Sequence, residues 1–168
     1  MAKYACVRTD NMAGTVLGKD LVSLKYTGAI ENGSIVAIGD FIDGEREVRT
    51  ATAPAVDAKI NELALVATPE VVKDLDYNGL ADFINEDGTI IRGYRLTSKD
   101  VFSVTKEAFE AGSNLKKGDV VEMTGTGVKM KSSASATGEV GDEPDKKTVT
   151  VIGKIVLVEG EWYVIEVA

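Results

Sequence analysis

The stretch KTVTVIGKIVLVEGEWYVIEV, residues 147–167, decides the fold class. Valine, isoleucine and threonine dominate it, and these side chains favour pleated strands. Glu159 and Gly160 interrupt the apolar run in its middle, as a tight turn between two antiparallel strands does. The stretch therefore predicts a β-hairpin made by residues 147–158 and 161–167.

The same pattern of short apolar runs separated by glycine recurs along the chain. Such runs are typical of strands bounded by turns. We expect further strands at residues 33–41, 44–51, 62–68, 89–96, 101–104, 119–124 and 127–131. Together they predict a mainly β protein, built as a β-barrel or in a sandwich-like way.

One or two short helices should accompany the strands. Thr68 and Pro69 suit the start of a helix over residues 69–75. Residues 80–84 place Leu80, Phe83 and Ile84 on one face of a helical turn, which we expect the core to bury. A third short helix is expected after Thr105, ending by Gly112.

The chain divides into an arm and one domain. Residues 1–24 are polar and weakly periodic, which predicts an extended N-terminal arm that either wraps a neighbour or stays loose. We expect residues 25–168 to form a single β-rich domain. Within it, residues 132–147 are rich in serine, alanine, glycine and charge, and we expect a mobile loop there.

Composition excludes several classes of protein. The chain has 168 residues with 44% apolar content, enough for a globular core. No run of apolar residues is long enough for a membrane helix, and no signal peptide is recognisable, so we expect a product made in the cytoplasm. The net charge of −8 disfavours a nucleic-acid partner.

Candidate catalytic residues are scarce. The chain has no histidine, which excludes Ser-His-Asp catalysis and the common histidine-ligated metal sites. Cys6 is the single cysteine, so it has no internal disulfide partner and we expect a small buried apolar residue. The sequence predicts no catalytic residue, no cofactor and no metal ligand, and hence a protein that is not an enzyme.

The stretch DLDYNGLADFIN, residues 74–85, begins like a calcium-binding loop. Asp74, Asp76 and Asn78 alternate before Gly79, as in an EF-hand. The twelfth position holds Asn85, which lacks the two anionic oxygens of the usual glutamate, and flanking helices of proper length are not expected. We interpret the stretch as an acidic turn, and weak cation binding by its first three acidic and amide side chains is left open.

Lys129 is a second candidate. It follows a Gly118-Asp119 turn and precedes Met130, an order similar to that of biotinyl and lipoyl carrier domains. The methionine that should precede the lysine is missing, and a low-complexity segment follows. The simpler interpretation is a lysine on an exposed strand face.

Several stretches together resemble a group of small structural proteins of tailed bacteriophages of Gram-positive hosts, encoded near the major capsid protein gene. The most specific of them is LADFINEDGTIIRGYRL, residues 80–96. The others are residues 31–54, 61–74, 97–109 and 153–167.

The resemblance implies a capsid decoration or auxiliary head protein, without catalytic residues. The expected partner is the major capsid protein, which this chain would bind on the outside of the assembled capsid. Whether the chain forms a homo-oligomer there, such as a trimer, is left open. The alternatives are a head-fibre or tail protein, or a carrier domain that uses Lys129.

Overall fold

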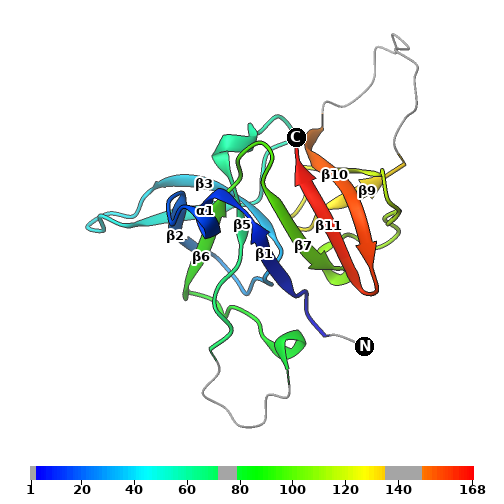
Figure 1. Cartoon of the computed structure of the whole chain (residues 1–168). Coiled ribbons are helices and arrows are strands. Elements are labelled where there is room, and N and C mark those ends of the chain that lie inside the picture. Colours follow the sequence, from blue (N-terminus) through cyan, green and yellow to red (C-terminus); the bar gives the residue numbers. More distant parts are fainter. Residues whose placement is uncertain (1–2, 72–78, 135–148) are drawn as a thin grey trace.

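The computed structural model describes residues 3–71, 79–134 and 149–168. The protein is mainly β, as the sequence predicts, and its strands form a six-stranded sheet and a five-stranded closed barrel. In Figure 1 the barrel lies on the left and the sheet on the right. The barrel is inserted in the chain between the first strand of the sheet and the remaining five.

The sheet is antiparallel throughout. In spatial order its strands are β1 (Val7–Asn11), β7 (Val101–Thr105), β11 (Trp162–Val167), β10 (Thr150–Glu159), β8 (Val120–Met123) and β9 (Lys131–Ser133). The predicted hairpin is confirmed as β10 and β11, which pair from Glu159 and Trp162 at the turn to Gly153 and Val167.

The barrel closes where its first strand pairs with its last. In spatial order its strands are β2 (Leu21–Tyr26), β4 (Val48–Thr52), β3 (Ile35–Phe41), β5 (Leu63–Val66) and β6 (Ile90–Arg95). The pair β2–β4 is parallel and the other four are antiparallel. The predicted pairing of residues 33–41 with 44–51 is confirmed as the β3–β4 hairpin.

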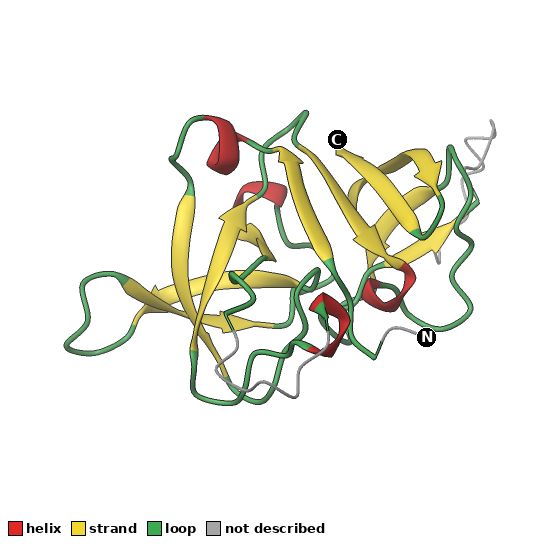
Figure 2. Ribbon diagram, turned by 60° about the horizontal axis from the view of Figure 1, so that its bottom comes forward, coloured by secondary structure: helices red, strands yellow, loops and turns green. Residues whose placement is uncertain are grey.

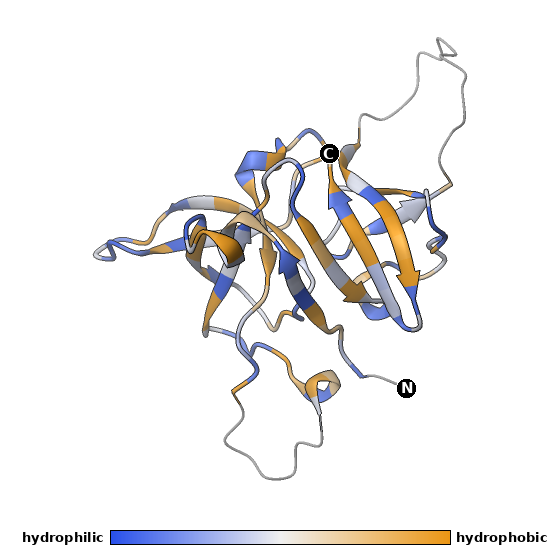
Figure 3. Cartoon of the chain, viewed as in Figure 1, coloured by the Kyte–Doolittle hydropathy of each residue, from blue (hydrophilic) through white to orange (hydrophobic). Residues whose placement is uncertain are grey.

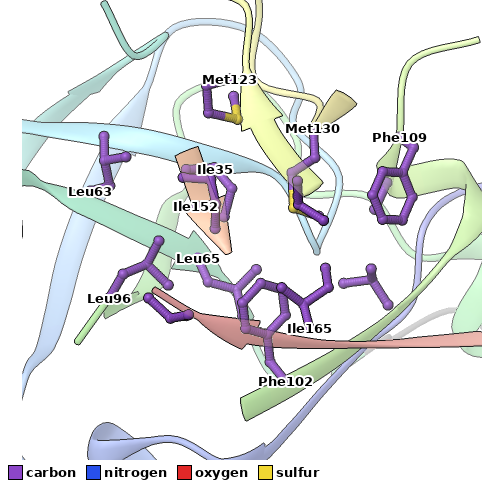
Figure 4. Close-up of a cluster of buried hydrophobic side chains, with 14 of the residues drawn as sticks. Ile35, Leu63, Leu65, Leu96, Phe102, Phe109, Met123, Met130, Ile152 and Ile165 are labelled. Atoms are coloured by element: carbon purple, nitrogen blue, oxygen red, sulfur yellow. The ribbon is translucent and has the colours of Figure 1, made fainter. Parts of the chain in front are cut away.

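One hydrophobic cluster joins the barrel to the sheet. Figure 4 shows Ile35 and Leu65 of the barrel packed against Phe102 and Ile165 of the sheet. All four side chains are fully buried. A second cluster, around Leu24, fills the barrel itself. Because the first cluster draws on both β units, neither unit could be removed without exposing the core of the other.

The helical segments within the described residues are all short. They are α1 (Ala13–Val16) and the 3₁₀ turns η1 (Ile60–Glu62), η2 (Leu80–Asp82) and η3 (Lys106–Ala108). The turn expected after Thr105 is confirmed as η3. The helix expected over residues 69–75 lies mostly outside the described residues, and Pro69 and Val71 in its first part are not helical.

The expectation of a buried face at residues 80–84 is wrong for Leu80. Its side chain is 55% exposed, whereas Phe83 and Ile84 are half-buried. The cause is that the turn lasts only three residues and the chain becomes extended at Phe83. Helical spacing therefore does not hold across the group.

The described part of the expected N-terminal arm is part of the fold. β1 pairs with β7, Met12 is fully buried, and β2 begins at Leu21. The Asp100 carboxylate accepts a hydrogen bond from the Ala13 backbone N–H at 2.8 Å and holds α1 in place. Residues 3–24 are thus attached to the body of their own chain, because their few apolar side chains complete its core.

Two predictions near β9 are also corrected. Of the strand expected at 127–131, only Lys131 is in a strand, because Val128 and Met130 bond instead to Ile35 and Ala108. Of the mobile loop expected at 132–147, Ser132 and Ser133 belong to β9. Residues 135–147 of that loop lie outside the described residues.

Candidate interaction site

Lys129, the candidate carrier lysine, is held by two partners. Its Nζ lies 2.9 Å from Oε1 of Glu31 and donates a hydrogen bond of 2.8 Å to the Glu107 carbonyl oxygen. The other carboxylate oxygen of Glu31 accepts the Ala5 N–H at 2.9 Å. Lys129 thus helps to connect the N-terminal segment, the barrel and the sheet. A carrier lysine needs a free amine at a hairpin tip, so this placement argues against that role.

The calcium-like stretch is only partly described. Asp74, Asp76 and Asn78 lie outside the described residues, whereas Gly79, Asp82 and Asn85 lie inside them. Asn85 is buried and its side chain points to the interior of the fold, so the twelfth position of the pattern serves as a structural group.

Asn85 and Asn32 form a buried amide pair. Nδ2 of Asn85 donates to the Ile30 carbonyl at 3.0 Å and to Oδ1 of Asn32 at 3.1 Å. Nδ2 of Asn32 in turn donates to the Thr68 carbonyl at 2.9 Å and to the Glu70 carboxylate at 3.0 Å. These bonds fasten the segment before β6 to the loops at one end of the barrel, a structural role that sequence spacing alone did not reveal.

Cys6 is a buried thiol, as expected. Its backbone exchanges hydrogen bonds with Thr105 in β7. Burial raises the pKa of the Cys6 thiol above its ordinary value, and the negative charges of Glu70 and Glu107 raise it further. The thiol is therefore protonated at neutral pH and poorly suited to act as a nucleophile.

Other site chemistry is limited in the part of the chain that the structure describes. There, no three histidine, cysteine, aspartate or glutamate side chains come together as a metal site. Nor is any described helix long and apolar enough to cross a membrane. The features that stand out are three surfaces.

The first surface is an apolar patch made by Val16, Leu17 and Leu21. These side chains are 63%, 64% and 41% exposed. α1 approaches the barrel closely at Gly14, where a Cβ atom would lie 3.2 Å from the Leu21 side chain and 2.7 Å from that of Tyr94. The Thr15 hydroxyl also donates to the Thr9 carbonyl at 2.9 Å. The patch is therefore held by its own chain while its aliphatic groups face solvent.

The second surface is the tip of the β3–β4 hairpin, residues 40–47, which projects beyond the barrel (Figures 1 and 2). Phe41 is 49% exposed, and the Arg49 guanidinium lies 3.9 Å from its ring centroid. Arg49 also donates to the Gly39 carbonyl at 3.2 Å. A register shift between Ile38 and Phe41 changes the direction in which Phe41 points.

Charge at this tip is mostly negative. Figure 3 shows a largely hydrophilic hairpin end. Four carboxylates and one guanidinium lie in residues 40–47, and they belong to Asp40, Asp43, Glu45, Glu47 and Arg46. The tip thus combines an exposed aromatic ring with an acidic rim.

The third surface is a groove of about 650 Å³ between the barrel and the sheet. Its walls are residues 56–61, the β6–β7 turn at 95–98, and residues 149–151 with Ala168. The Thr150 hydroxyl joins two walls by donating toward the Val56 and Ala58 carbonyls, at 2.9 and 3.0 Å.

The lining of this groove is mainly apolar, with Lys59 and Arg95 as its cations and Asp57 as its acid. Its position follows from contacts between three distant segments, so the sequence did not indicate it. The alternation of Val56, Ala58 and Ile60 after Pro54 is the signal that could have marked one wall.

Comparisons of the chain with protein-family models, with curated proteins and with solved structures found no match.

Proposed function

We propose that the protein is a non-enzymatic virion protein that binds the outside of an assembled phage capsid and stabilises it. The proposal joins the sequence resemblance to one observation, the exposed apolar patch at Val16, Leu17 and Leu21. Its partner would be the major capsid protein.

The patch has the properties of a contact surface. Each large aliphatic side chain that passes from water into a well-packed contact contributes roughly 1.5–3 kcal/mol. The three side chains are presented without a large entropy loss on binding, because α1 is fixed to the turn at Asp100 and to β1. A decoration protein needs binding energy of this kind rather than a catalytic site.

The charge of the chain agrees with the outer face of a capsid. A net charge of −8 repels packaged DNA, whose phosphates lie inside the shell. An acidic exterior protein would avoid that repulsion.

Co-sedimentation with expanded, DNA-free capsids of a phage that carries the gene tests the proposal. The wild-type chain should bind and should raise the temperature at which the capsids fall apart. The variant Leu17→Asp should bind roughly tenfold or more weakly, because a carboxylate would be desolvated in the contact.

Leu157→Asp is the matched control, since Leu157 is an exposed leucine on β10, outside the patch. It should bind like wild type. Equal binding by wild type and Leu17→Asp would show that the patch is not the contact. A wild-type chain that binds tails or head fibres but not capsids would support the alternative virion role and overturn the capsid proposal.

The carrier alternative has a separate test. The intact mass of the chain isolated from its natural source should equal the unmodified mass. A biotin- or lipoyl-sized increment on Lys129 would overturn the present proposal.

A further inference from the structure

We propose that copies of this chain associate head to tail, with the β3–β4 hairpin tip of one copy seated in the barrel–sheet groove of the next. The inference stands on the hairpin and the groove, and it does not depend on capsid binding through the patch. It concerns the self-association of the chain, whatever its larger partner.

The hairpin tip is acidic and the groove carries cations. Residues 40–47 bring four carboxylates against the single guanidinium of Arg46. Lys59 and Arg95 at the groove face only Asp57 among the side chains that line it. The side chains that line the groove thus include two cations and one acid, and an acidic element would be steered toward the cations.

The apolar parts also match. Phe41 presents about half of its surface to solvent at the base of the tip, and Val56, Ile60 and Val151 are among the apolar residues that line the groove. The groove's volume of about 650 Å³ is in the range that encloses a small ligand or a few side chains. A buried aromatic anchor surrounded by charged groups is the usual arrangement of an interface hot spot.

The hairpin is prepared for docking. The Arg49 guanidinium over the ring and its bond to the Gly39 carbonyl hold Phe41 in place. Gly44 at the turn has φ of 82°, a left-handed conformation that glycine adopts without strain. Less conformational entropy is therefore lost when the tip enters a partner.

One chain cannot fill its own groove with its own tip. Figure 1 shows the β3–β4 hairpin projecting from the barrel on the side away from the sheet. The groove is lined instead by the β6–β7 turn, residues 149–151 and Ala168, where the barrel meets the sheet. The contact must join two copies, and it uses different surfaces on each. Repeated head to tail, such a contact continues from copy to copy until the rotation closes a ring or a filament forms, whereas two copies that exchange tips reciprocally would form a closed dimer.

Sedimentation equilibrium of the full chain provides the first test. Wild type should self-associate, whereas Phe41→Ser and Lys59→Glu should each raise the dissociation constant by roughly tenfold or more. Neither Lys59 nor Glu45 forms a salt bridge within the described residues, so their substitution should leave the fold intact. Thermal melting of each variant checks this.

Exchanging the two charges across the proposed contact gives a second test. The double variant Glu45→Lys with Lys59→Glu restores opposite charges across the contact and should regain much of the lost association. Lys106→Glu, at the exposed first residue of η3 and outside the groove, is the matched control and should associate like wild type. A wild-type chain that stays monomeric at every soluble concentration would overturn the inference.

Cross-linking distinguishes tip-to-groove contacts from tip-to-tip contacts. Asp43→Cys mixed with Lys59→Cys should form a mixed disulfide dimer under mild oxidation, and neither variant alone should do so. Cys6 does not interfere, because it is buried. Efficient self-linking by Asp43→Cys alone would show that two hairpin tips meet and would contradict the groove as their site.

Discussion

At the scale of single residues, two buried asparagines carry the clearest energetic role. Asn32 and Asn85 satisfy one another and also serve backbone groups of neighbouring loops. When one member of such a pair is truncated, the remaining polar groups stay buried without partners. An uncompensated group of this kind costs about 1–3 kcal/mol.

Asn85→Ala should therefore lower the free energy of unfolding by roughly 2–4 kcal/mol, since several bonds are lost together. Urea denaturation measures the change. Asn61→Ala is the control, because Asn61 is exposed and contributes its backbone carbonyl, rather than its side chain, to Arg95. Similar midpoints for both variants would mean that the buried amide pair adds little stability.

Cys6 gives the fold a pH dependence of known sign. Its pKa is raised in the folded state by burial and by Glu70 and Glu107, so the folded chain holds the thiol proton more tightly than the unfolded chain. The resulting stability is fully present below the unfolded pKa and is lost as pH rises through the higher folded pKa.

The free energy of unfolding should thus fall more steeply with alkaline pH in wild type than in Cys6→Ala. Denaturant titrations of both proteins from pH 7 to pH 10 isolate the cysteine, because tyrosine and lysine contribute equally to each (about pH 8.5 is the ordinary midpoint of a thiol). Parallel pH profiles would contradict the raised pKa.

At the scale of elements, local pattern predicted the hairpins well. The β10–β11 and β3–β4 hairpins follow from period-two alternation and a turn within a few residues. The closure of the barrel and the parallel β2–β4 pair were not predictable, because their registers are set by residues far apart in the chain. The prediction that Leu80 is buried is wrong for a local reason, since a three-residue turn does not maintain helical spacing.

Gly153 shows how closely β10 and β11 pack. A Cβ atom at this position would overlap the carbonyl oxygen of Glu166 on the neighbouring strand. Gly153→Ala must therefore push two central strands apart, and it should destabilise the protein by roughly 1–3 kcal/mol. Gly127→Ala, where no atom lies within 4 Å of the added Cβ, should change the thermal midpoint little by comparison. If both variants melt at the same temperature, then β10 and β11 can adjust to the added methyl group at little cost.

At the scale of the whole molecule, the N-terminal segment completes the sheet. Deleting residues 1–12 removes β1 and the fully buried Met12, and it leaves β7 as an open edge. The truncated chain should melt at a lower temperature and should aggregate, as thermal melting and size-exclusion chromatography would show. A soluble truncated chain with an unchanged melting temperature would restore the interpretation of this segment as a separate arm.

The candidate surfaces also belong to this scale, which explains why the sequence did not predict them. The groove exists only because residues 56–61, 95–98 and 149–151 meet after both β units have formed. The exposure of Val16 and Leu17 likewise depends on where α1 is held against the barrel. The sequence alone does not show whether an apolar side chain lies in the core or on a contact surface.

The pairing of β1 with β7 has a consequence for how the chain is made. Val7 leaves the ribosome long before its partner Val104, and the five barrel strands emerge between them. The barrel is thus contiguous in synthesis and can close while the chain is still growing, whereas the sheet must wait for its last strand, β11, which lies between β7 and β10. The order of synthesis therefore favours a nascent chain whose barrel strands are already paired, while its first strand and the barrel's share of the common core still await the sheet.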